Sequence, residues 1–232
     1  PPAADNCCGA AQMACPQERR KTLTDNNAAK PQGFAELGIT GGLLKAALDV
    51  GFETPKPIQE KAIPAMLQGR DVLGIAQTGS GKTAAFSLPI LSQIIGLGTK
   101  RLPRTARALI LCPTRELAVQ IDEVVRSLAK HAHLATALVL GGVSRGSQVR
   151  RLAQGVDVLI ATPGRLTDIV RSGELSLAET RWLVLDEADR MLDMGFINDV
   201  RRIARATHAD RQTALFSATM PKEIDQLAGS LL

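Results

Sequence analysis

The chain has 232 residues, which is enough for one large domain or two small ones. Its composition, 45% hydrophobic and 22% charged, is that of a globular chain and excludes wholesale disorder and fibrous repeats. A formal net charge of +5 mildly favours a polyanionic partner, although a basic surface that only serves solubility remains an alternative. Aromatic residues make up 3% of the chain, which leaves few rings on which a fold could stack several single-stranded bases.

The N-terminal segment, residues 1–30, lacks apolar periodicity and is rich in Ala, Pro, Asn and charge. We expect it to be a flexible extension and leave it out of the fold prediction. It holds Cys7, Cys8 and Cys15 without a C-x-x-C pair, so neither a metal site nor a disulfide framework is expected. No leader pattern occurs, and the longest apolar stretch, residues 84–98, is too short and too polar to span a membrane. The sequence therefore predicts a cytoplasmic location and no membrane partner.

From residue 31 onward, short apolar runs alternate with amphipathic stretches. Strands are expected at residues 72–76, 108–112, 137–140, 156–161, 182–185 and 213–217. Helices are expected at residues 41–50, 58–68, 82–95, 115–130, 144–153, 164–171, 196–206 and 221–231. Apolar strands spaced by helices indicate a mostly parallel sheet that is covered on both faces. We therefore predict one doubly wound α/β domain over residues 31–232, with its ligands at the carboxyl ends of the strands.

The first strong motif follows the strand at 72–76 and opens a helix, with the sequence Ala76-Gln77-Thr78-Gly79-Ser80-Gly81-Lys82-Thr83. It matches the phosphate-loop pattern G-x-x-x-x-G-K-[ST], except that Ala76 stands at the first glycine. The two glycines let backbone N–H groups converge on phosphate oxygens, and Lys82 supplies a point charge. Thr83 offers a hydroxyl to Mg²⁺. The alternative, an ordinary glycine turn before a helix, is disfavoured by the strand–loop–helix context.

A second motif, Asp186-Glu187-Ala188-Asp189, follows the strand at 182–185. In a parallel sheet its acidic side chains lie at the same edge as the phosphate loop. Asp186 is placed to hold Mg²⁺ through water, and Glu187 is placed to polarise an attacking water. Acidic residues after a strand are also common helix-start residues, but their pairing with the phosphate loop favours the nucleotide interpretation.

Together, these two motifs resemble those of the DEAD-box ATP-dependent RNA helicases, and the resemblance extends over nearly all of residues 34–232. Within the family, residues 188–196 are most similar to the bacterial RhlE subgroup. The resemblance implies the N-terminal RecA-like lobe, with ATP and Mg²⁺ as its cofactors. It implies catalytic roles for Lys82, Asp186 and Glu187, and metal contacts from Thr83 and Asp186. The implied phosphate contacts come from Gln77, Thr78, Gly79, Ser80, Gly81, Lys82 and Thr83.

The run Gly51-Phe52-Glu53-Thr54-Pro55-Lys56-Pro57-Ile58-Gln59 resembles the adenine-reading motif of the family, with Phe34 as its upstream aromatic residue. A glutamine amide can accept from adenine N6 and donate to N7, whereas guanine offers a carbonyl in place of the amine. The resemblance therefore implies that Phe34, Phe52 and Gln59 bind the base, and that ATP is preferred over GTP. Lys56 departs from the usual Ser or Thr of the family. Without the resemblance, Gln59 would be predicted as a solvent-facing helix residue.

Three short runs that follow strands resemble the loops with which the family holds RNA: Pro113-Thr114-Arg115-Glu116, Gly141-Gly142 and Thr162-Pro163-Gly164-Arg165. Gln148 and Arg151 match a further RNA contact of the family. Hydroxyls, helix N-termini and arginines suit phosphates and do not read bases, so the implied RNA binding is independent of sequence. Taken alone, these runs are more typical of turns.

The run Ser217-Ala218-Thr219 resembles the coupling motif of the family, which implies hydrogen bonds from Ser217 and Thr219 to Asp189. A helix N-cap is the alternative. The family also carries a second RecA-like lobe with catalytic arginines, and no His-Arg-x-Gly-Arg run occurs here. The resemblance thus implies a C-terminal lobe as the partner in cis, without which this lobe binds nucleotide, hydrolyses ATP poorly and does not unwind duplexes. A DNA translocase and a non-catalytic nucleotide-dependent binding module remain alternatives.

The remaining basic residues are predicted to lack a site function. One group is expected in a loop between a helix and a strand: Lys100, Arg101, Arg104 and Arg107. A second group, Arg201, Arg202 and Arg205, lies at helical spacing and is expected to form a solvated face. The oligomeric state is not predicted.

Overall fold

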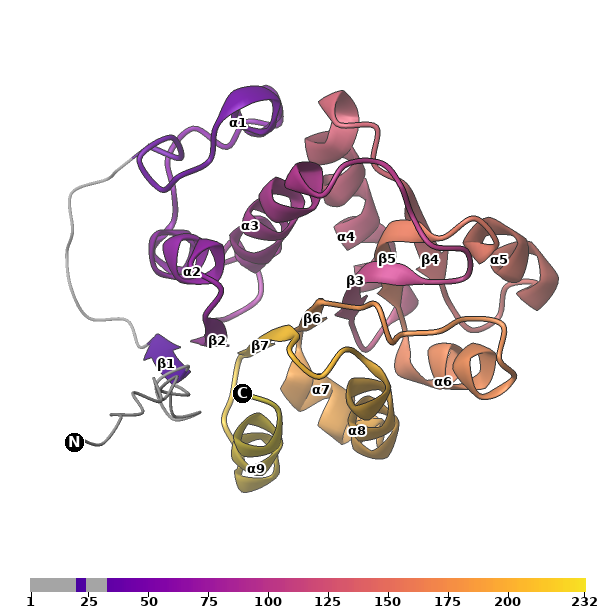
Figure 1. Ribbon diagram of the computed structural model, residues 1–232. Coiled ribbons are helices and arrows are strands. Elements are labelled where there is room, and N and C mark those ends of the chain that lie inside the picture. The colour runs from indigo at the N-terminus through magenta and orange to yellow at the C-terminus, as the bar shows by residue number, and fades with distance from the viewer. Residues whose placement is uncertain (1–19, 24–32) are drawn as a thin grey trace, which may run out of the picture.

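The computed structural model describes residues 20–23 and 33–232 of the chain (Figure 1). Most of the segment expected to be a flexible extension, residues 1–30, lies outside the described residues. Of that segment, the structure describes Arg20–Leu23, which forms the strand β1. No strand was predicted there, because four residues carry too little periodic pattern to be recognised.

Within the described residues, seven strands form one entirely parallel sheet with the order β1-β2-β7-β6-β3-β5-β4. After β1, the strands are β2 (Asp71–Ile75), β3 (Ala106–Leu111), β4 (Thr136–Val139), β5 (Val156–Ala161), β6 (Trp182–Leu185) and β7 (Gln212–Ser217). Each of the predicted strands is present, with ends displaced by at most two residues. Because all of them run the same way, the loops that carry the motifs leave the sheet at one edge.

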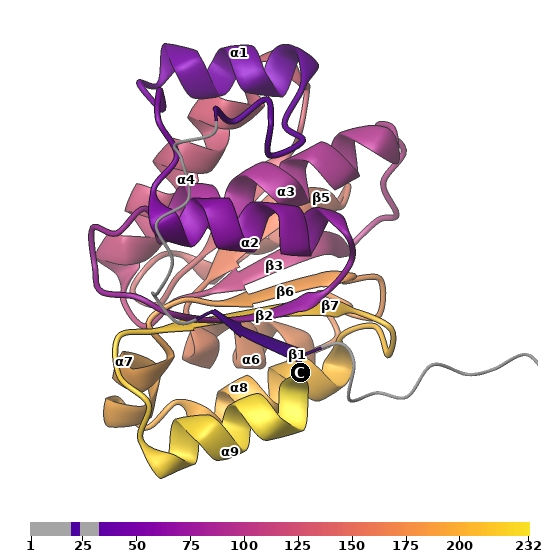
Figure 2. The same ribbon diagram turned by 90° about the vertical axis from the view of Figure 1, so that its left-hand side faces the viewer.

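Helices cover both faces of the sheet, as predicted, with α1 to α4 on one face and α6 to α9 on the other (Figure 2). Their bounds are α1 (Gly41–Asp49), α2 (Pro57–Leu67), α3 (Lys82–Gly96), α4 (Arg115–Leu128), the 3-10 helix η2 (Ala129–His131), α5 (Arg145–Leu152), α6 (Pro163–Arg171), α7 (Ala188–Asp193), α8 (Ile197–Ala206) and α9 (Lys222–Leu231). The short helix α7, which begins within the acidic motif, was not predicted. The doubly wound α/β architecture is confirmed.

Two hydrophobic cores form because successive side chains of a strand point to opposite faces of the sheet. In β3, Ala108 and Ile110 pack into the core beneath α1 to α4, whereas Leu109 and Leu111 pack into the core against α6 to α9. These four side chains are buried, so the strand reads as a continuous apolar run instead of an alternating one.

One buried cluster corrects the prediction for the basic residues before β3. Arg107 lies inside β3, and its guanidinium is 3.1 Å from the carboxylate of Asp157. The guanidinium of Arg101 is 2.8 Å from the same carboxylate. Asp157 is fully buried and also accepts a hydrogen bond from the backbone N–H of Ala135. The two arginines therefore hold the loop before β3 against β5, since a buried carboxylate requires such partners.

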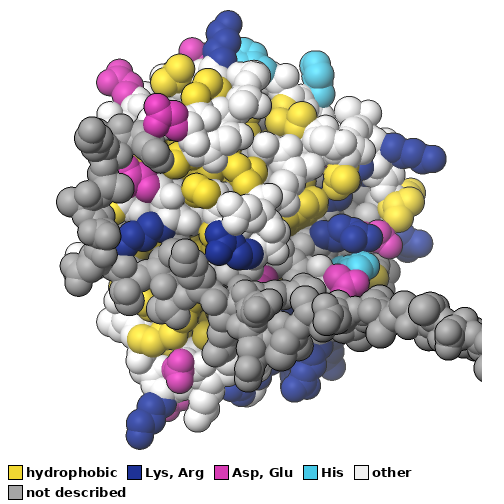
Figure 3. All heavy atoms as spheres, turned by 60° about the vertical axis from the view of Figure 1, so that its left-hand side comes forward, with side chains coloured by type: hydrophobic (Ala, Val, Ile, Leu, Met, Phe, Trp, Pro, Cys, Tyr) yellow, Lys and Arg dark blue, Asp and Glu magenta, His cyan; other side chains and the backbone are white. Residues whose placement is uncertain are grey.

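The surface that carries α1 and α2 shows hydrophobic side chains interspersed with polar and charged ones (Figure 3).

Among the helices of the described chain, none combines the length and apolar character needed to cross a bilayer.

Candidate functional site

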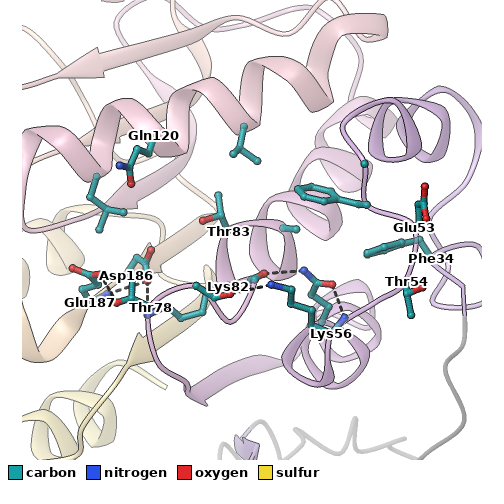
Figure 4. A pocket seen from close by; sticks show the side chains of 18 residues that line it. Phe34, Glu53, Thr54, Lys56, Thr78, Lys82, Thr83, Gln120, Asp186 and Glu187 are labelled. Atoms are coloured by element: carbon teal, nitrogen blue, oxygen red, sulfur yellow. Dashed lines mark hydrogen bonds and ion pairs between the residues drawn. The ribbon is translucent and has the colours of Figure 1, made fainter.

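A cavity of about 650 Å³ opens at the carboxyl edge of the sheet, between the start of α2, the loop at 76–83, α4 and the end of β6. Figure 4 shows Phe34, Glu53 and Thr54 at one end, which we call the aromatic end. Thr78, Asp186 and Glu187 lie at the other end, with Lys82 and Thr83 between them and the aromatic end. We call the part of the cavity that these five residues line the acid end. The predicted nucleotide residues that line the cavity are Phe34, Phe52, Gln59, Thr78, Gly79, Gly81, Lys82 and Thr83.

The loop at 76–83 needs its glycines. Gly79 and Gly81 have φ values of +82° and +92°, in the region that side chains other than glycine rarely adopt. A Cβ atom on Gly81 would lie 2.5 Å from Nε2 of Gln59. The turn that aims backbone N–H groups at a ligand is therefore available to this sequence because glycine stands at both positions.

Opposite charges lie close together at the acid end. The Nζ atom of Lys82 lies 3.6 Å from Oδ1 of Asp186 and donates to the carbonyl of Ala76 at 3.2 Å. Both side chains are buried. Burial raises the pKa of Asp186 to about 6 even though Lys82 lowers it, and the neighbouring Glu187 raises it further. Each member of this pair keeps hydrogen-bonding capacity, so the lysine is available to an anion and the carboxylate to a cation or water.

Glu187 is held in an unusual backbone conformation, with φ at +54° and ψ at +53°. One carboxylate oxygen accepts a hydrogen bond from the Thr78 hydroxyl at 3.2 Å, and the other lies 3.4 Å from Nη1 of Arg190. A non-glycine residue in this conformation stores strain, which persists where the surroundings require it. The strain and both contacts place the carboxylate beside the phosphate loop.

The aromatic end is built by ring contacts and by a buried amide. The rings of Phe34 and Phe52 are 6.3 Å apart between centroids, and Phe34 is 2% exposed. Gln59 is 3% exposed, so the prediction of a solvent-facing residue, made without the resemblance, is wrong. Its Oε1 accepts from the backbone N–H of Lys56 at 2.8 Å, and its Nε2 donates to the carbonyl of Gly81 at 3.0 Å. Each amide atom retains one further hydrogen bond for a ligand.

Sequence reasoning missed some residues that line this cavity. Leu117, Gln120 and Val124 form its α4 wall, and their i, i+3, i+7 spacing is the pattern that could have placed them on one helix face. The Nζ atom of Lys56 donates to the carbonyl of Gly79 at 3.0 Å. Lys56 and Gln59, both at the start of α2, therefore brace the phosphate loop.

Two of the predicted phosphate-loop residues, Gln77 and Ser80, do not line this cavity. They line a separate cavity of about 500 Å³, together with Ala218. The hydroxyl of Ser80 is buried without a hydrogen-bond partner. Side chains at these positions of the loop point away from the acid end, so their contribution to a ligand would come from backbone N–H groups.

The predicted contacts of the coupling motif are present. The N–H and hydroxyl of Thr219 both donate to Oδ2 of Asp189 at 2.9 Å, and the N–H of Asp189 donates to the Ser217 hydroxyl at 3.2 Å. Burial would raise the pKa of Asp189, but the hydrogen bonds from Thr219, Ser217 and the Arg190 N–H outweigh it and lower the pKa. Asp189 is therefore ionised and tied to the loop after β7.

The three predicted RNA loops meet around residues 141–143. The guanidinium of Arg115 lies over Gly142, where a Cβ atom would be 2.6 Å from Nη1. Gly142 has a φ of +70°, so this position also favours glycine. Arg165 donates to the carbonyl of Val143 at 2.8 Å. Two arginines thus flank the glycine pair at the carboxyl edge of β4.

Other predicted RNA residues fit a direct contact less well. Gln148 is buried. Its Oε1 atom accepts a hydrogen bond from the N–H of Leu140, and its Nε2 atom donates to the carbonyls of Leu140 and Val143. In this conformation Gln148 positions the glycine loop, and its direct contact with RNA stays a prediction. Thr114 caps α4, because its hydroxyl accepts a hydrogen bond from the Leu117 N–H at 3.3 Å. Of the remaining predicted RNA residues, two are exposed, Glu116 and Arg151; Gly164 is half-buried, and the buried ones are Pro113, Thr162 and Pro163.

No group of three or more His, Cys, Asp or Glu side chains within the described residues is arranged to hold a metal ion. The oxygen ligands at the acid end are the Asp186 carboxylate and the Thr83 hydroxyl, which are of the type that Mg²⁺ prefers. A metal at this end would take its other ligands from water and from a bound phosphate, as Mg²⁺ usually does. The residues present therefore fit Mg²⁺ delivered with a nucleotide.

Comparisons with known proteins agree with this geometry. The sequence model of the DEAD/DEAH box helicase family matches residues 56–227. The chain is 48% identical over 195 residues to an ATP-dependent RNA helicase DeaD of Haemophilus influenzae, covering 84% of the chain and 31% of that protein. It is 44% identical over 211 residues to a DEAD-box ATP-dependent RNA helicase RhpA of Helicobacter pylori, covering 91% of the chain and 42% of that protein.

A solved structure has the same fold. The crystal structure of a DEAD box protein from the hyperthermophile Methanococcus jannaschii superposes with a TM-score of 0.79 at 40% identity, covering 86% of this chain and 53% of that one. The chain thus spans between about a third and about two-fifths of the two curated relatives, and about half of the solved structure.

Proposed function

Because the chain belongs to the DEAD/DEAH box helicase family, we propose that residues 31–232 are the ATP-binding, RecA-like lobe of an ATP-dependent RNA helicase. In the parent protein this lobe couples ATP binding and hydrolysis to sequence-independent RNA binding and local duplex unwinding. The observation that carries the proposal is the buried Lys82–Asp186 pair at 3.6 Å, which joins the phosphate loop to the acidic motif in one cavity. The assignment to the RhlE subgroup and the cytoplasmic location remain predictions.

The acid end supplies the groups that phosphoryl transfer requires. Backbone N–H groups of the loop at 76–83 and the ammonium of Lys82 would bind the β- and γ-phosphates. Thr83 and, through water, Asp186 would hold Mg²⁺, which neutralises charge on the phosphates when bound. Glu187, positioned by Thr78 and Arg190, would orient the attacking water and accept its proton.

The aromatic end would select the base. Phe34 and Phe52 supply an apolar wall, and Gln59 retains one donor and one acceptor for the N6 and N7 positions of adenine. Since the same amide holds Gly81, binding of adenine would be linked to the conformation of the phosphate loop.

The glycine loop at 141–142 and the flanking Arg115 and Arg165 would bind the RNA backbone. The link between Asp189 and the loop at 217–219 would pass the nucleotide state to a second RecA-like lobe. The relatives extend beyond the matched region, and we propose that turnover and unwinding need that further part of the protein.

A calorimetric titration of the chain with Mg-ADP, and with Mg-GDP beside it, tests this proposal. We expect binding of ADP without binding of GDP. Equal binding of both would leave the phosphate loop in place and remove the adenine assignment. Absence of binding by either nucleotide would contradict the assignment of this lobe as nucleotide-binding.

A further inference from the structure

A second polar cavity, of about 550 Å³, lies far from the carboxyl edge and is lined by Arg201, Arg205, Arg211, Gln226, Ser230 and Leu231. We call it the arginine pocket. Its residues come from the second half of α8, from the position directly before β7, and from the second half of α9. Figure 2 shows α8 and α9 on the face of the sheet opposite α2 and α3. Because Arg211 precedes β7, the pocket lies at the amino ends of the strands, at the opposite edge from the nucleotide cavity.

The positive charge of this pocket is not compensated within it. No carboxylate lines it, and none of the ion pairs between described residues includes Arg201, Arg205 or Arg211. Arg201 and Arg205 stand at i, i+4 on one helix, a spacing at which like charges repel. An anion between them would remove that repulsion.

Arg211 is a half-buried member of the pocket. Its Nε atom is buried without a hydrogen-bond partner. Burial lowers the pKa of Arg211, although nearby Asp71 acts in the opposite direction. Arg211 thus adds a third guanidinium to a lining that contains no carboxylate.

The predicted solvated face of α8 is present, since Arg202 and Arg205 are exposed and Arg201 is half-buried. Arg201 and Arg205 line the pocket, whereas Arg202, between them in sequence, lies outside it and is 3.9 Å from Asp199. Arg201 and Arg205 are therefore accessible to solvent at the pocket, whereas Arg202, with a side chain that is 65% exposed, points outside it.

We propose that the arginine pocket binds backbone phosphates of RNA. Guanidinium groups match phosphate oxygens with two parallel hydrogen bonds, and Ser230 and Gln226 add neutral donors. No aromatic side chain lines the pocket, so bases would not stack there and binding would be independent of sequence. The inference rests on the proposed function in taking RNA as the ligand, and it adds a contact at the edge opposite the loops at 113–116, 141–142 and 162–165.

The test compares two double variants of the whole chain, R201A/R205A and the control R202A/K222A. Each removes two positive charges, but Arg202 and Lys222 lie outside the pocket. Binding of a fluorescently labelled single-stranded RNA is measured by anisotropy between about 50 and 200 mM salt. We expect R201A/R205A to lose about tenfold in affinity and to reduce the salt slope by about 1.4, twice the 0.7 expected for each phosphate contact. The control should lose clearly less.

Further arms separate the possible ligands. Equal losses in the two double variants, or no RNA binding by the unmodified chain at low salt, would overturn the proposal. So would stabilisation by inorganic phosphate that depends on Arg201 and Arg205 while RNA affinity does not, since the pocket would then bind free phosphate. Arginine-dependent binding of polyglutamate in place of RNA would assign the pocket to an acidic protein.

The proposed function has its own readout in the same experiment. Mg-ADP affinity should be the same in R201A/R205A and in the unmodified chain, because the pocket is remote from the nucleotide cavity. RNA affinity that depends on Arg115 and Arg165 but not on Arg201 and Arg205 would leave the proposed function standing and remove this inference alone. Equal melting temperatures of the two double variants would exclude unfolding as the cause of a loss.

Discussion

The two ends of the nucleotide cavity are held by different kinds of interaction. At the acid end, Lys82 and Asp186 form a buried pair of opposite charges, and removal of one partner of such a pair costs several kcal/mol. At the aromatic end, Phe34 and Phe52 contact through their rings, and Gln59 makes neutral hydrogen bonds worth about 1 kcal/mol each. If the proposed function holds, we therefore expect the acid end to dominate affinity and chemistry and the aromatic end to select the base.

The largest effect is expected from Glu187→Gln at the acid end, measured as RNA-stimulated ATP hydrolysis in a two-lobe protein. Turnover should fall at least about 100-fold, because the amide cannot accept a proton from water. Nucleotide affinity should be unchanged, since the glutamine oxygen can still accept from Thr78. Asp193→Asn, on the exposed side of α7, is the matched control. Turnover equal to that of the control would remove Glu187 as the base.

The next effect is expected from Lys82→Ala. Loss of the ammonium removes the phosphate ligand and leaves the buried Asp186 without its partner, so Mg-ADP affinity should fall by about 100-fold, or about 3 kcal/mol. Calorimetry measures this change, with Lys45→Ala on the exposed face of α1 as the control. An affinity matching that of Lys45→Ala would mean that the acid end does not dominate binding.

The raised pKa of Asp186 predicts a stability that depends on pH. Its pKa in the fold is about 6, above the ordinary value of 3.8, so the folded state binds this proton more tightly than the unfolded chain does. The free energy of unfolding, compared with that of the Asp186→Asn variant, should therefore fall as pH rises from 3.8 to about 6 and then level off. The total change is about 3 kcal/mol. Urea unfolding of both proteins across this range measures it, and parallel stability curves would show that Asp186 titrates normally.

The smallest effect is expected at the aromatic end, from Gln59→Ala. The variant loses the two neutral hydrogen bonds proposed to adenine and the brace to Gly81, so ADP affinity should fall about tenfold. The preference for ADP over GDP should disappear, because the amide that distinguishes them is gone. Titrations with both nucleotides measure this, with the exposed Gln68→Ala as control. An equal loss for both nucleotides with the preference retained would make Gln59 a brace of the phosphate loop and not a reader of the base.

The interpretation that failed concerns Gln59, a side chain whose partner lies elsewhere in the fold. Gln59 was predicted to face solvent when taken without the resemblance, yet it bonds Gly81 on the phosphate loop. The amide of Gln148, for which an RNA contact is predicted, bonds the nearby backbone of Leu140 and Val143. A glutamine in a sequence has no pattern that distinguishes a ligand contact from a backbone brace, because both use the same donor and acceptor.

Local sequence was sufficient for the parallel α/β fold, the phosphate loop and the acidic motif, since apolar periodicity and glycine-dependent turns act over a few residues. The order of the strands was not accessible in this way. This order sets β7 between β2 and β6 and brings Glu187 to Thr78 across 109 positions of sequence. The arginine pocket likewise exists because the fold brings residues of α8, of α9 and before β7 around one cavity. Burial, pKa shifts and uncompensated charge arise from such distant contacts, which the packing of the whole domain creates.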